Sequence, residues 1–352
     1  MNVYFPFERP GNNFLDEIEN YFKGTFIFDT NQVIEKKKID IINIHWPEAF
    51  FKWEEPTVVQ LNELRQKILS WKKKYPIVYT RHNIYPHNKK AKNLIKLYDF
   101  IAANADVVIH LGMFSMKDFK IRYPNNNCIH TCVEHPLYLL KKNDITKKEA
   151  REFFGISEKS KVLLSFGALR NKKEFKLLFG AFQKIKLKNK KLFISRKPGF
   201  RFEIPFLIRS YTLNGYYDRL YKKIMGTIYN IVFYDASFID QDEVQKYLLL
   251  ADTLVIARMD QLNSGDLFLG LTFKKKIVVP KFGNLIEILE GLDVFSYIPG
   301  NEVSLQKAMS QSLTKEFTDN RNQDYMNRWH PKKISDETYS VFKKAVNIRK
   351  NG

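Results

Sequence analysis

One short segment in the second half of the chain combines residue types that bind anions. Asn263, Ser264 and Gly265 follow an apolar run, Thr253–Ala257, and open a second apolar run, Ser264–Thr272, with helical character. The first amides of a helix have no partner within the helix and carry positive partial charge, and a glycine there lets a ligand approach the backbone. The segment therefore predicts an anion site, although Asn and Ser are also ordinary residues for capping a helix.

Two polar segments in the first half each follow a strand-like run. His45, Trp46 and Glu48 come directly after one run, and His82 and His87 come after the next. His82 and Glu48 are candidates for a general base, because each could accept the proton of a hydroxyl group within hydrogen-bonding reach. A buried, hydrogen-bonded structural role is an equally open interpretation for both residues.

The run Cys128-x-His130-x-Cys132-x2-His135 contains the residue types that bind zinc. On a strand, residues 128, 130 and 132 would follow one face at steps of roughly 7 Å. Ligands spread along one straight strand suit a tetrahedral ion poorly. The chain also has no Asp-x-Asp triplet. We therefore expect no metal site and no required cofactor.

The elements that must position these residues alternate between strands and helices. The first half predicts strands at Met1–Phe5, Thr25–Asp29, Ile39–Ile44, Ile77–Thr80, Val107–His110 and Cys128–Val133, and helices at Phe14–Tyr21, Val58–Lys74, Lys90–Asn104 and Met116–Arg122. After a polar stretch, Lys141–Thr146, the second half predicts strands at Lys161–Phe166, Lys191–Ser195, Ile231–Tyr234, Thr253–Ala257 and Ile277–Pro280, and helices at Glu174–Lys184, Gln241–Ala251, Ser264–Thr272 and Ile334–Val346. This alternation predicts an α/β fold with two tandem Rossmann-like, doubly wound domains, in which ligands bind at the carboxyl ends of the strands.

The block from Asp252 to Glu287 resembles the donor-binding segment of GT-B glycosyltransferases. The similarity lies near the family 4-like enzymes that build bacterial capsule, exopolysaccharide and lipopolysaccharide. In the subset that this chain resembles, an Asn-Ser-Gly helix start replaces a pair of glutamates, and Gln261 and Leu269 stand at the positions of that pair. Glu287 is then the expected carboxylate for the ribose or the sugar.

A second block, Phe166–Lys173, resembles the strand–loop signature in which an arginine and a lysine hold the diphosphate of the donor. Arg170 and Lys173 occupy those positions, and Glu174 replaces the glycine that usually follows the lysine. Cations there would stabilise the charge that develops on a departing nucleoside diphosphate.

The resemblance implies two domains with a cleft between them and assigns residues to each side. The expected divisions are an N-terminal acceptor-binding domain at 1–140, a linker at 141–147, a nucleotide-sugar-binding domain at 148–325 and a helix at 326–352 that crosses back. The expected donor is a nucleoside-diphosphate sugar of the UDP or GDP type, bound by Gly167, Arg170, Lys173, Arg258, Asn263, Ser264, Gly265 and Glu287. The expected acceptor residues are Gly11, Asn12, His45, Trp46, His87 and His135, with His82, Glu48, Arg170 and Lys173 as the catalytic set.

Charge and composition suggest where such an enzyme would work. The chain of 352 residues has a net charge of +20, and the segment from Glu63 to Arg122 holds 13 Lys and Arg against 4 Asp and Glu. Such an excess attracts anionic lipid, phosphorylated substrates or nucleic acid, although solvated lysines alone would also explain it. Two cysteines, no visible signal peptide and no long apolar stretch fit a cytoplasmic protein on the inner face of a membrane.

We therefore expect a metal-independent glycosyltransferase that acts on a lipid-linked or glycan acceptor, as a monomer or weak dimer. The segment Phe200–Asn230 mixes aromatic and basic residues, as in a lid or an interfacial surface, and local core packing is equally open. Two other functions stay open: a protein that binds nucleic acid or an anionic surface, and a GT-B-like epimerase. The chain shows no nucleic-acid recognition motif, so nucleic acid is not an expected partner.

Overall fold

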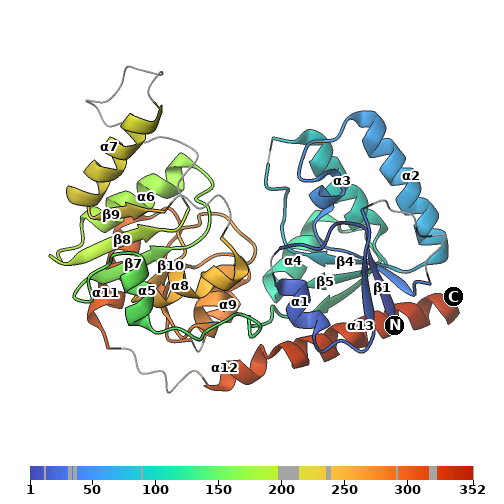
Figure 1. Cartoon of the computed structure of the whole chain (residues 1–352). Coiled ribbons are helices and arrows are strands. Elements are labelled where there is room, and N and C mark those ends of the chain that lie inside the picture. The colour runs from blue at the N-terminus through green and yellow to red at the C-terminus, as the bar shows by residue number, and fades with distance from the viewer. Residues whose placement is uncertain are drawn as a thin grey trace.

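The computed structural model folds the chain into two α/β lobes, each built on a six-stranded parallel sheet (Figure 1). It describes residues 1–11, 13–30, 34, 38–88, 90–196, 214–234, 239–290, 292–316 and 323–351. Asn12 and residues 200–213 of the aromatic and basic segment lie outside the described residues.

The N-terminal sheet has the strand order β2-β1-β3-β4-β5-β6. Its strands are β1 Asn2–Phe5, β2 Thr25–Phe28, β3 Ile41–Ile44, β4 Ile77–Arg81, β5 Val107–His110 and β6 Ile129–Cys132. Its helices are α1 Phe14–Glu19, η1 Pro47–Phe51 (a 3-10 helix), α2 Val58–Lys74, α3 Lys92–Asn104 and α4 Met113–Arg122. All residues of β3, β4 and β5 are buried, as expected for parallel strands covered by helices on both faces.

The C-terminal sheet has the strand order β12-β11-β10-β7-β8-β9. Its strands are β7 Lys161–Ser165, β8 Lys190–Ile194, β9 Ile231–Phe233, β10 Thr253–Val255, β11 Lys276–Pro280 and β12 Phe295–Tyr297. The other elements are α5 Lys147–Phe153, α6 Lys172–Gln183, α7 Asn214–Thr227, η2 Gln241–Glu243, α8 Val244–Leu250, α9 Gly265–Thr272, α10 Leu285–Ile288, α11 Glu302–Thr314, α12 Gln323–Arg328 and α13 Pro331–Asn351.

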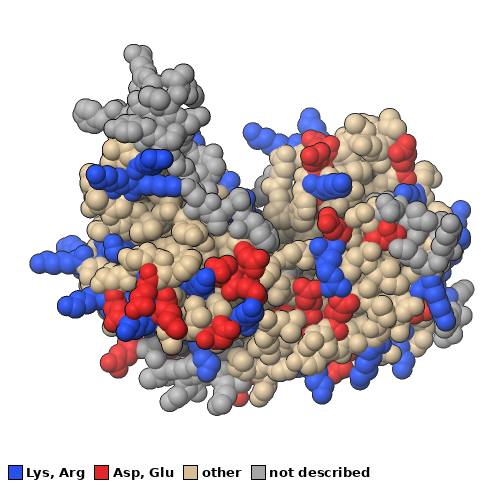
Figure 2. All heavy atoms as spheres, in the orientation of Figure 1, with Lys and Arg blue, Asp and Glu red and all other residues tan. Residues whose placement is uncertain are grey.

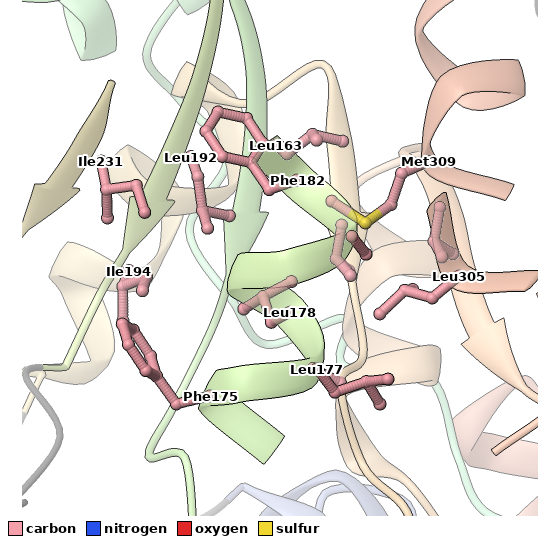
Figure 3. Packing of buried hydrophobic residues seen from close by; sticks show 14 of the residues in the cluster. Leu163, Phe175, Leu177, Leu178, Phe182, Leu192, Ile194, Ile231, Leu305 and Met309 are labelled. Carbon is pink, nitrogen blue, oxygen red and sulfur yellow. The ribbon is translucent and has the colours of Figure 1, made fainter. Parts of the chain in front are cut away.

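Helices α6 and α11 pack side by side over one face of this second sheet. Phe175, Leu178 and Phe182 of α6 are buried against the strands, and Leu305 and Met309 of α11 close the cluster (Figure 3). The apolar residues of α6 recur at helical spacing, so one face of the helix can bury them all. This packing fixes the start of α6, which follows the loop that carries Arg170.

The two strand orders place a crevice in each lobe. In the first sheet the chain moves from β1 to β2 and then returns to β3 on the other side of β1; in the second it moves outward from β7 in both directions. At such a switch point the loops after two neighbouring strands part and leave room for a ligand. The α/β fold of two doubly wound, parallel sheets, predicted from the sequence, is confirmed.

Several element bounds differ from the sequence predictions for identifiable reasons. Helix α4 begins at Met113 rather than at 116, because its first amides are capped from the other lobe, as described below. The predicted helix Gln241–Ala251 divides into a 3-10 turn and α8. Strand β12 and helix α11 were not predicted.

The last helix, α13, lies along the N-terminal lobe rather than the C-terminal one (Figure 1). Ile334, Phe342 and Ala345 are buried in the same cluster as Phe14 and Ile18 of α1. Just before it, the carbonyl of the buried Trp329 accepts a hydrogen bond of 2.9 Å from the amide of Leu137. None of the described helices combines the length and apolar character needed to cross a membrane.

Candidate functional site

A cavity of about 250 Å³ lies between residues of the two lobes, and the surface is notched between them (Figure 2). The N-terminal lobe contributes Gly11 and Asn13, which follow β1. The C-terminal lobe and the segment that leads to it contribute Tyr138, Lys141, Phe166, Gly167, Arg196, Ile239, Gln241, Val244, Gly265, Asp266 and Leu269. The cavity therefore lies at the carboxyl ends of β1, β7 and β10, where the two switch points meet.

Glycines at the cavity wall let a ligand reach the backbone. Gly167 follows β7 with a φ of +72°, a left-handed conformation that favours glycine, and a Cβ atom there would meet open space. Its amide donates a hydrogen bond of 2.9 Å to Ser195 Oγ. Gly265 begins α9, and a Cβ atom there would lie 2.9 Å from Tyr138 Oη. The backbone conformation of Gly167 favours glycine, whereas a side chain at position 265 would require Tyr138 to shift.

Two arginines converge beside the first turn of α9. Arg258 Nη1 forms an ion pair of 3.1 Å with Glu174 Oε2, and the same oxygen accepts a hydrogen bond of 2.7 Å from the amide of Arg170. Desolvation, and after it the charge of Arg258, lower the pKa of Arg170. Desolvation raises the pKa of Asp266, and the two arginines partly offset that rise. The structure thus brings Arg170 and Arg258 close to a helix start.

Glu174 explains why this chain departs from the glycine usual at that position. Its side chain is buried, and its backbone amide is capped by Asn171 Oδ1 at 3.0 Å. From there the carboxylate reaches Arg258, which is 84 positions away in the sequence. Lys173 lies on the same turn of α6, and its side chain is exposed.

A chain of hydrogen bonds runs through the buried ends of β3 and β4. Thr80 Oγ1 donates to Asn43 Oδ1 at 3.0 Å, and Asn43 Nδ2 lies 2.9 Å from His45 Nε2. His45 Nδ1 then lies 2.8 Å from His82 Nε2. Desolvation lowers the pKa of His45 to about 3 and that of His82 well below its ordinary value, so both imidazoles are neutral at pH 7.

This chain of contacts selects a tautomer for each histidine. An amide Nδ2 group can only donate, so His45 Nε2 accepts and its proton lies on Nδ1. That proton is donated to His82 Nε2, which leaves the proton of the neutral His82 on Nδ1. His82 is partly exposed, and its ring stacks on Trp46 with 4.4 Å between ring centres. In this tautomer the free nitrogen of His82 is a donor, whereas a general base needs a lone pair.

Glu48 is buried and both of its oxygens are occupied. Oε1 lies 2.7 Å from His87 Nδ1, and Oε2 accepts a short hydrogen bond from Tyr98. His87 is exposed, and its ring lies 5.3 Å from that of Trp53. The carboxylate therefore orients His87 and leaves Nε2 facing outward from the pair, which is the arrangement of a carboxylate-supported base.

Side chains of the C-terminal lobe also hold the N-terminal lobe directly. Asn263 Nδ2 donates to the carbonyl of His82 at 2.9 Å, and Asn284 Nδ2 donates to Asn263 Oδ1 at 2.6 Å. Asn284 Oδ1 in turn accepts from the amide of Ser115 at 2.9 Å. Glu287 Oε2 accepts from the amide of Met113 at 2.8 Å. Glu287 thus caps α4, and Asn263 joins the lobes through the carbonyl of His82. We expected both residues at the donor, and their role in donor binding stays a prediction.

The remaining predicted residues are spread around these features. Ser264 is buried and precedes α9, His135 is buried and stacks on Phe268 with 4.3 Å between ring centres, and Trp46 is buried beside His82. Among the described residues, no group of three or more His, Cys, Asp or Glu side chains is arranged to hold a metal ion.

The sequence predicted Gly11, Gly167 and Gly265 among the residues that line the cavity and missed the others, including Tyr138, Lys141, Arg196 and Asp266. Arg196 is the second residue after β8, so an inspection of the residues that follow each strand would have found it. Lys141 was assigned to a linker, and only the folding of that segment against the cavity reveals it.

Comparisons with solved structures match both lobes together. HepE of Anabaena in complex with UDP has a TM-score of 0.66 at 14% identity, and the match covers 98% of this chain and 100% of that one. A glycosyltransferase from Rickettsia africae has a TM-score of 0.67 at 11% identity, covering 98% of each chain. Sucrose-phosphate synthase from Thermosynechococcus elongatus has a TM-score of 0.62 at 12% identity, covering 88% of this chain and 74% of that one.

At these identities the similarity establishes the fold, and the chain has the GT-B fold. Protein-family models and curated protein sequences give no match.

Proposed function

We propose that this protein is a glycosyltransferase that moves a sugar from a nucleoside-diphosphate sugar, of the UDP type, to an acceptor in cell-surface polysaccharide synthesis. The observation that carries the proposal is the interlobe cavity, whose wall has glycines at the two sites where the backbone must be approached and a pair of arginines nearby. HepE, which has the same fold, binds UDP and UDP-glucose. In this proposal residues 1–140 bind the acceptor, 141–147 link the lobes and 148–325 bind the donor.

The donor diphosphate lies against the start of α9 in this proposal. Amides at Ser264 and Gly265 and the side chains of Arg170 and Arg258 balance its charge, and Lys173 reaches it from the first turn of α6. As the bond to the sugar breaks, negative charge grows on the leaving diphosphate, and fixed cations stabilise that charge without rearranging. The same cations can fill the role of a metal ion, so we propose a metal-independent reaction.

The acceptor approaches from the ends of β3 and β4. The Glu48–His87 pair offers an imidazole nitrogen for the acceptor hydroxyl, and His82 offers a hydrogen-bond donor rather than the base we expected from the sequence. Contact between the lobes through Asn263 and Asn284 keeps these groups beside the donor cavity and excludes water, which would otherwise hydrolyse the donor.

The excess positive charge supports a place at an anionic membrane surface, where a lipid-linked acceptor would be found. On the face in Figure 2, Lys and Arg are interspersed with Asp and Glu over both lobes, so this face carries no uniform basic patch. Membrane contact is therefore proposed for another face.

The proposal is tested by replacing Lys173. Lys173→Ala should reduce sugar transfer from UDP-glucose or a related donor by at least 100-fold without changing the melting temperature, because the side chain is exposed. Lys176→Ala, also exposed on α6, is the matched control and should keep full activity. Full transfer in Lys173→Ala would remove this lysine from the diphosphate site. UDP release without acceptor would favour an epimerase or a hydrolase.

A further inference from the structure

A second cavity, of about 210 Å³, lies at the amino edge of the C-terminal sheet. Lys161 and Lys276 are the first residues of β7 and β11, and Asp252 directly precedes β10, so the cavity lies at the edge opposite the carboxyl ends that face the interlobe site. Five of its lining residues are lysines: Lys147, Lys161, Lys274, Lys275 and Lys276. Asp252 is the one acidic residue among those that line it.

Three donors within the protein already contact the carboxylate of Asp252. Its carboxylate lies 2.5 Å from Lys147 Nζ and 3.0 Å from an Nη atom of the buried Arg151, and it accepts a hydrogen bond of 2.7 Å from the amide of Val162. Arg151 adds a sixth positive charge next to the five lysines. With Arg151 beside the five lysines, the wall has six basic side chains and one carboxylate, that of Asp252.

One of these lysines, Lys274, has a strained backbone conformation. Lys274 has a φ of +50° at the end of α9, and the amide of Lys275 closes the turn on the carbonyl of Gly270 at 2.9 Å. This is the helix-ending turn in which glycine is favoured at the left-handed position. In this chain the residue at that position is Lys274, which lies on the cavity wall.

Crowding of positive charge is also visible in the acid–base properties of the wall. Desolvation, and then the charge of Lys147, lower the pKa of Lys275 to about 8, with Arg151 acting in the same direction and Asp252 against it. Desolvation and the charge of Lys161 lower the pKa of Lys276. The carbonyl end of α9 favours cations nearby. Desolvation is the largest cause of both pKa shifts, and the neighbouring cations add to it.

We propose that this lysine-lined cavity binds a phosphate group, as an anion site separate from the nucleotide-sugar cavity. A phosphate brings about two negative charges and several acceptor oxygens to a wall with five lysine side chains that can donate to it. That group belongs to a soluble phosphate compound or to the headgroup of an anionic phospholipid.

The test is calorimetric titration of the whole protein with inorganic phosphate at pH 7, in the presence of saturating UDP to occupy the interlobe site. The wild type should bind one phosphate, and the variant with Lys161→Ala and Lys276→Ala should bind it at least 10-fold more weakly. Lys186→Ala with Lys188→Ala, which removes two exposed lysines of the same lobe, is the control and should bind like the wild type.

Proton uptake gives a second readout that surface lysines would not produce. Bound phosphate should restore the proton on Lys275, so near pH 8 the heat of binding should depend on the ionisation enthalpy of the buffer. The affinity for phosphate should fall as the pH rises above 8, because Lys275 then loses its positive charge. Only Lys147, Lys161, Lys274 and Lys276 would still attract the anion.

Sedimentation with vesicles distinguishes the two sources of the phosphate. Binding to phosphatidic acid vesicles that is lost in the double variant and competed by phosphate identifies a lipid headgroup, and binding of free phosphate alone identifies a soluble compound. Saturable binding that is unchanged in the double variant, or no saturable binding in either assay, overturns the proposal. Because UDP binding is measured separately, failure here leaves the proposed transferase activity untouched, and the reverse also holds.

Discussion

At the scale of single residues, the site is built from groups that are neutral or paired. His45 and His82 are uncharged, Glu48 is held by two partners and Glu174 holds Arg258. The arrangement leaves Arg170 and Lys173 as exposed cations for a diphosphate. Each pairing depends on residues far apart in the sequence, so residue type alone could suggest the members of the site but not their partners.

The tautomer of His82 is set from β3. Asn43→Asp would place two acceptor oxygens beside His45, so the proton of His45 would move to Nε2. His45 Nδ1 would then accept a hydrogen bond from His82 Nε2. His82 Nδ1 would lose its proton and carry a lone pair. We expect nitrogen NMR to show the proton of His82 on Nδ1 in the wild type and on Nε2 in the variant. Transfer should fall about 10–100-fold, the equivalent of one lost hydrogen bond to substrate.

His130, which lies outside this chain of contacts, is the internal control and should keep its spectrum. A wild-type His82 with its proton on Nε2 would contradict the orientation of Asn43 and restore His82 as a candidate base.

Glu17 should make stability depend on pH. The carboxyl is buried, its Oε1 accepts from the amide of Leu140 at 2.7 Å, and desolvation raises its pKa from 4.5 to about 7. Between these values the folded state keeps a proton that the unfolded state loses, so the free energy of unfolding falls as the pH rises from about 4.5 to 7. Glu17→Gln should remove this fall and stabilise the protein by about 1–2 kcal/mol at pH 8.

Denaturant unfolding at pH 5 and pH 8 measures the effect, with the exposed Glu63→Gln as the control. Equal stabilities of Glu17→Gln and wild type at pH 8 would show that Glu17 ionises freely in the folded protein.

At the scale of elements, the sequence predicted most strands because buried parallel strands are continuous apolar runs. It missed β12, Phe295–Tyr297, which is defined by pairing with β11. It placed the start of α4 at 116 because the groups that cap Met113 and Ser115 come from positions 287 and 284. Local sequence patterns reflect the propensity and periodicity of an element. They do not reveal its contacts with distant segments of the chain.

Helix α6 is the element that holds the diphosphate-binding loop in place. Leu178 is fully buried between the second sheet and α11, so Leu178→Ala should cost about 2–5 kcal/mol of unfolding free energy. Exposed Leu69→Ala on α2 should cost less than 1 kcal/mol and is the comparison. Chemical denaturation measures both, and a small loss at Leu178 would indicate that α6 is not packed as described.

At the scale of the whole molecule, two asparagines and a glutamate hold the lobes together around the cavity. Asn284 is fully buried, so Asn284→Ala removes the partner of the Ser115 amide and of Asn263 Oδ1. We expect a loss of about 1–3 kcal/mol and a larger radius of gyration in small-angle X-ray scattering as the lobes separate. Glu287→Gln keeps an oxygen for Met113 and should stay compact. An unchanged radius in Asn284→Ala would show that other contacts set the closure.

The central claim is that the interlobe cavity binds the nucleotide of the donor through Arg170. Calorimetric titration with UDP tests it most directly, on wild type, Arg170→Ala and the control Lys172→Ala, whose side chain is also exposed. We predict one UDP per chain, a dissociation constant at least 10-fold higher in Arg170→Ala and no change in Lys172→Ala. No binding of UDP to the wild type, or equal binding by all three proteins, would contradict the account.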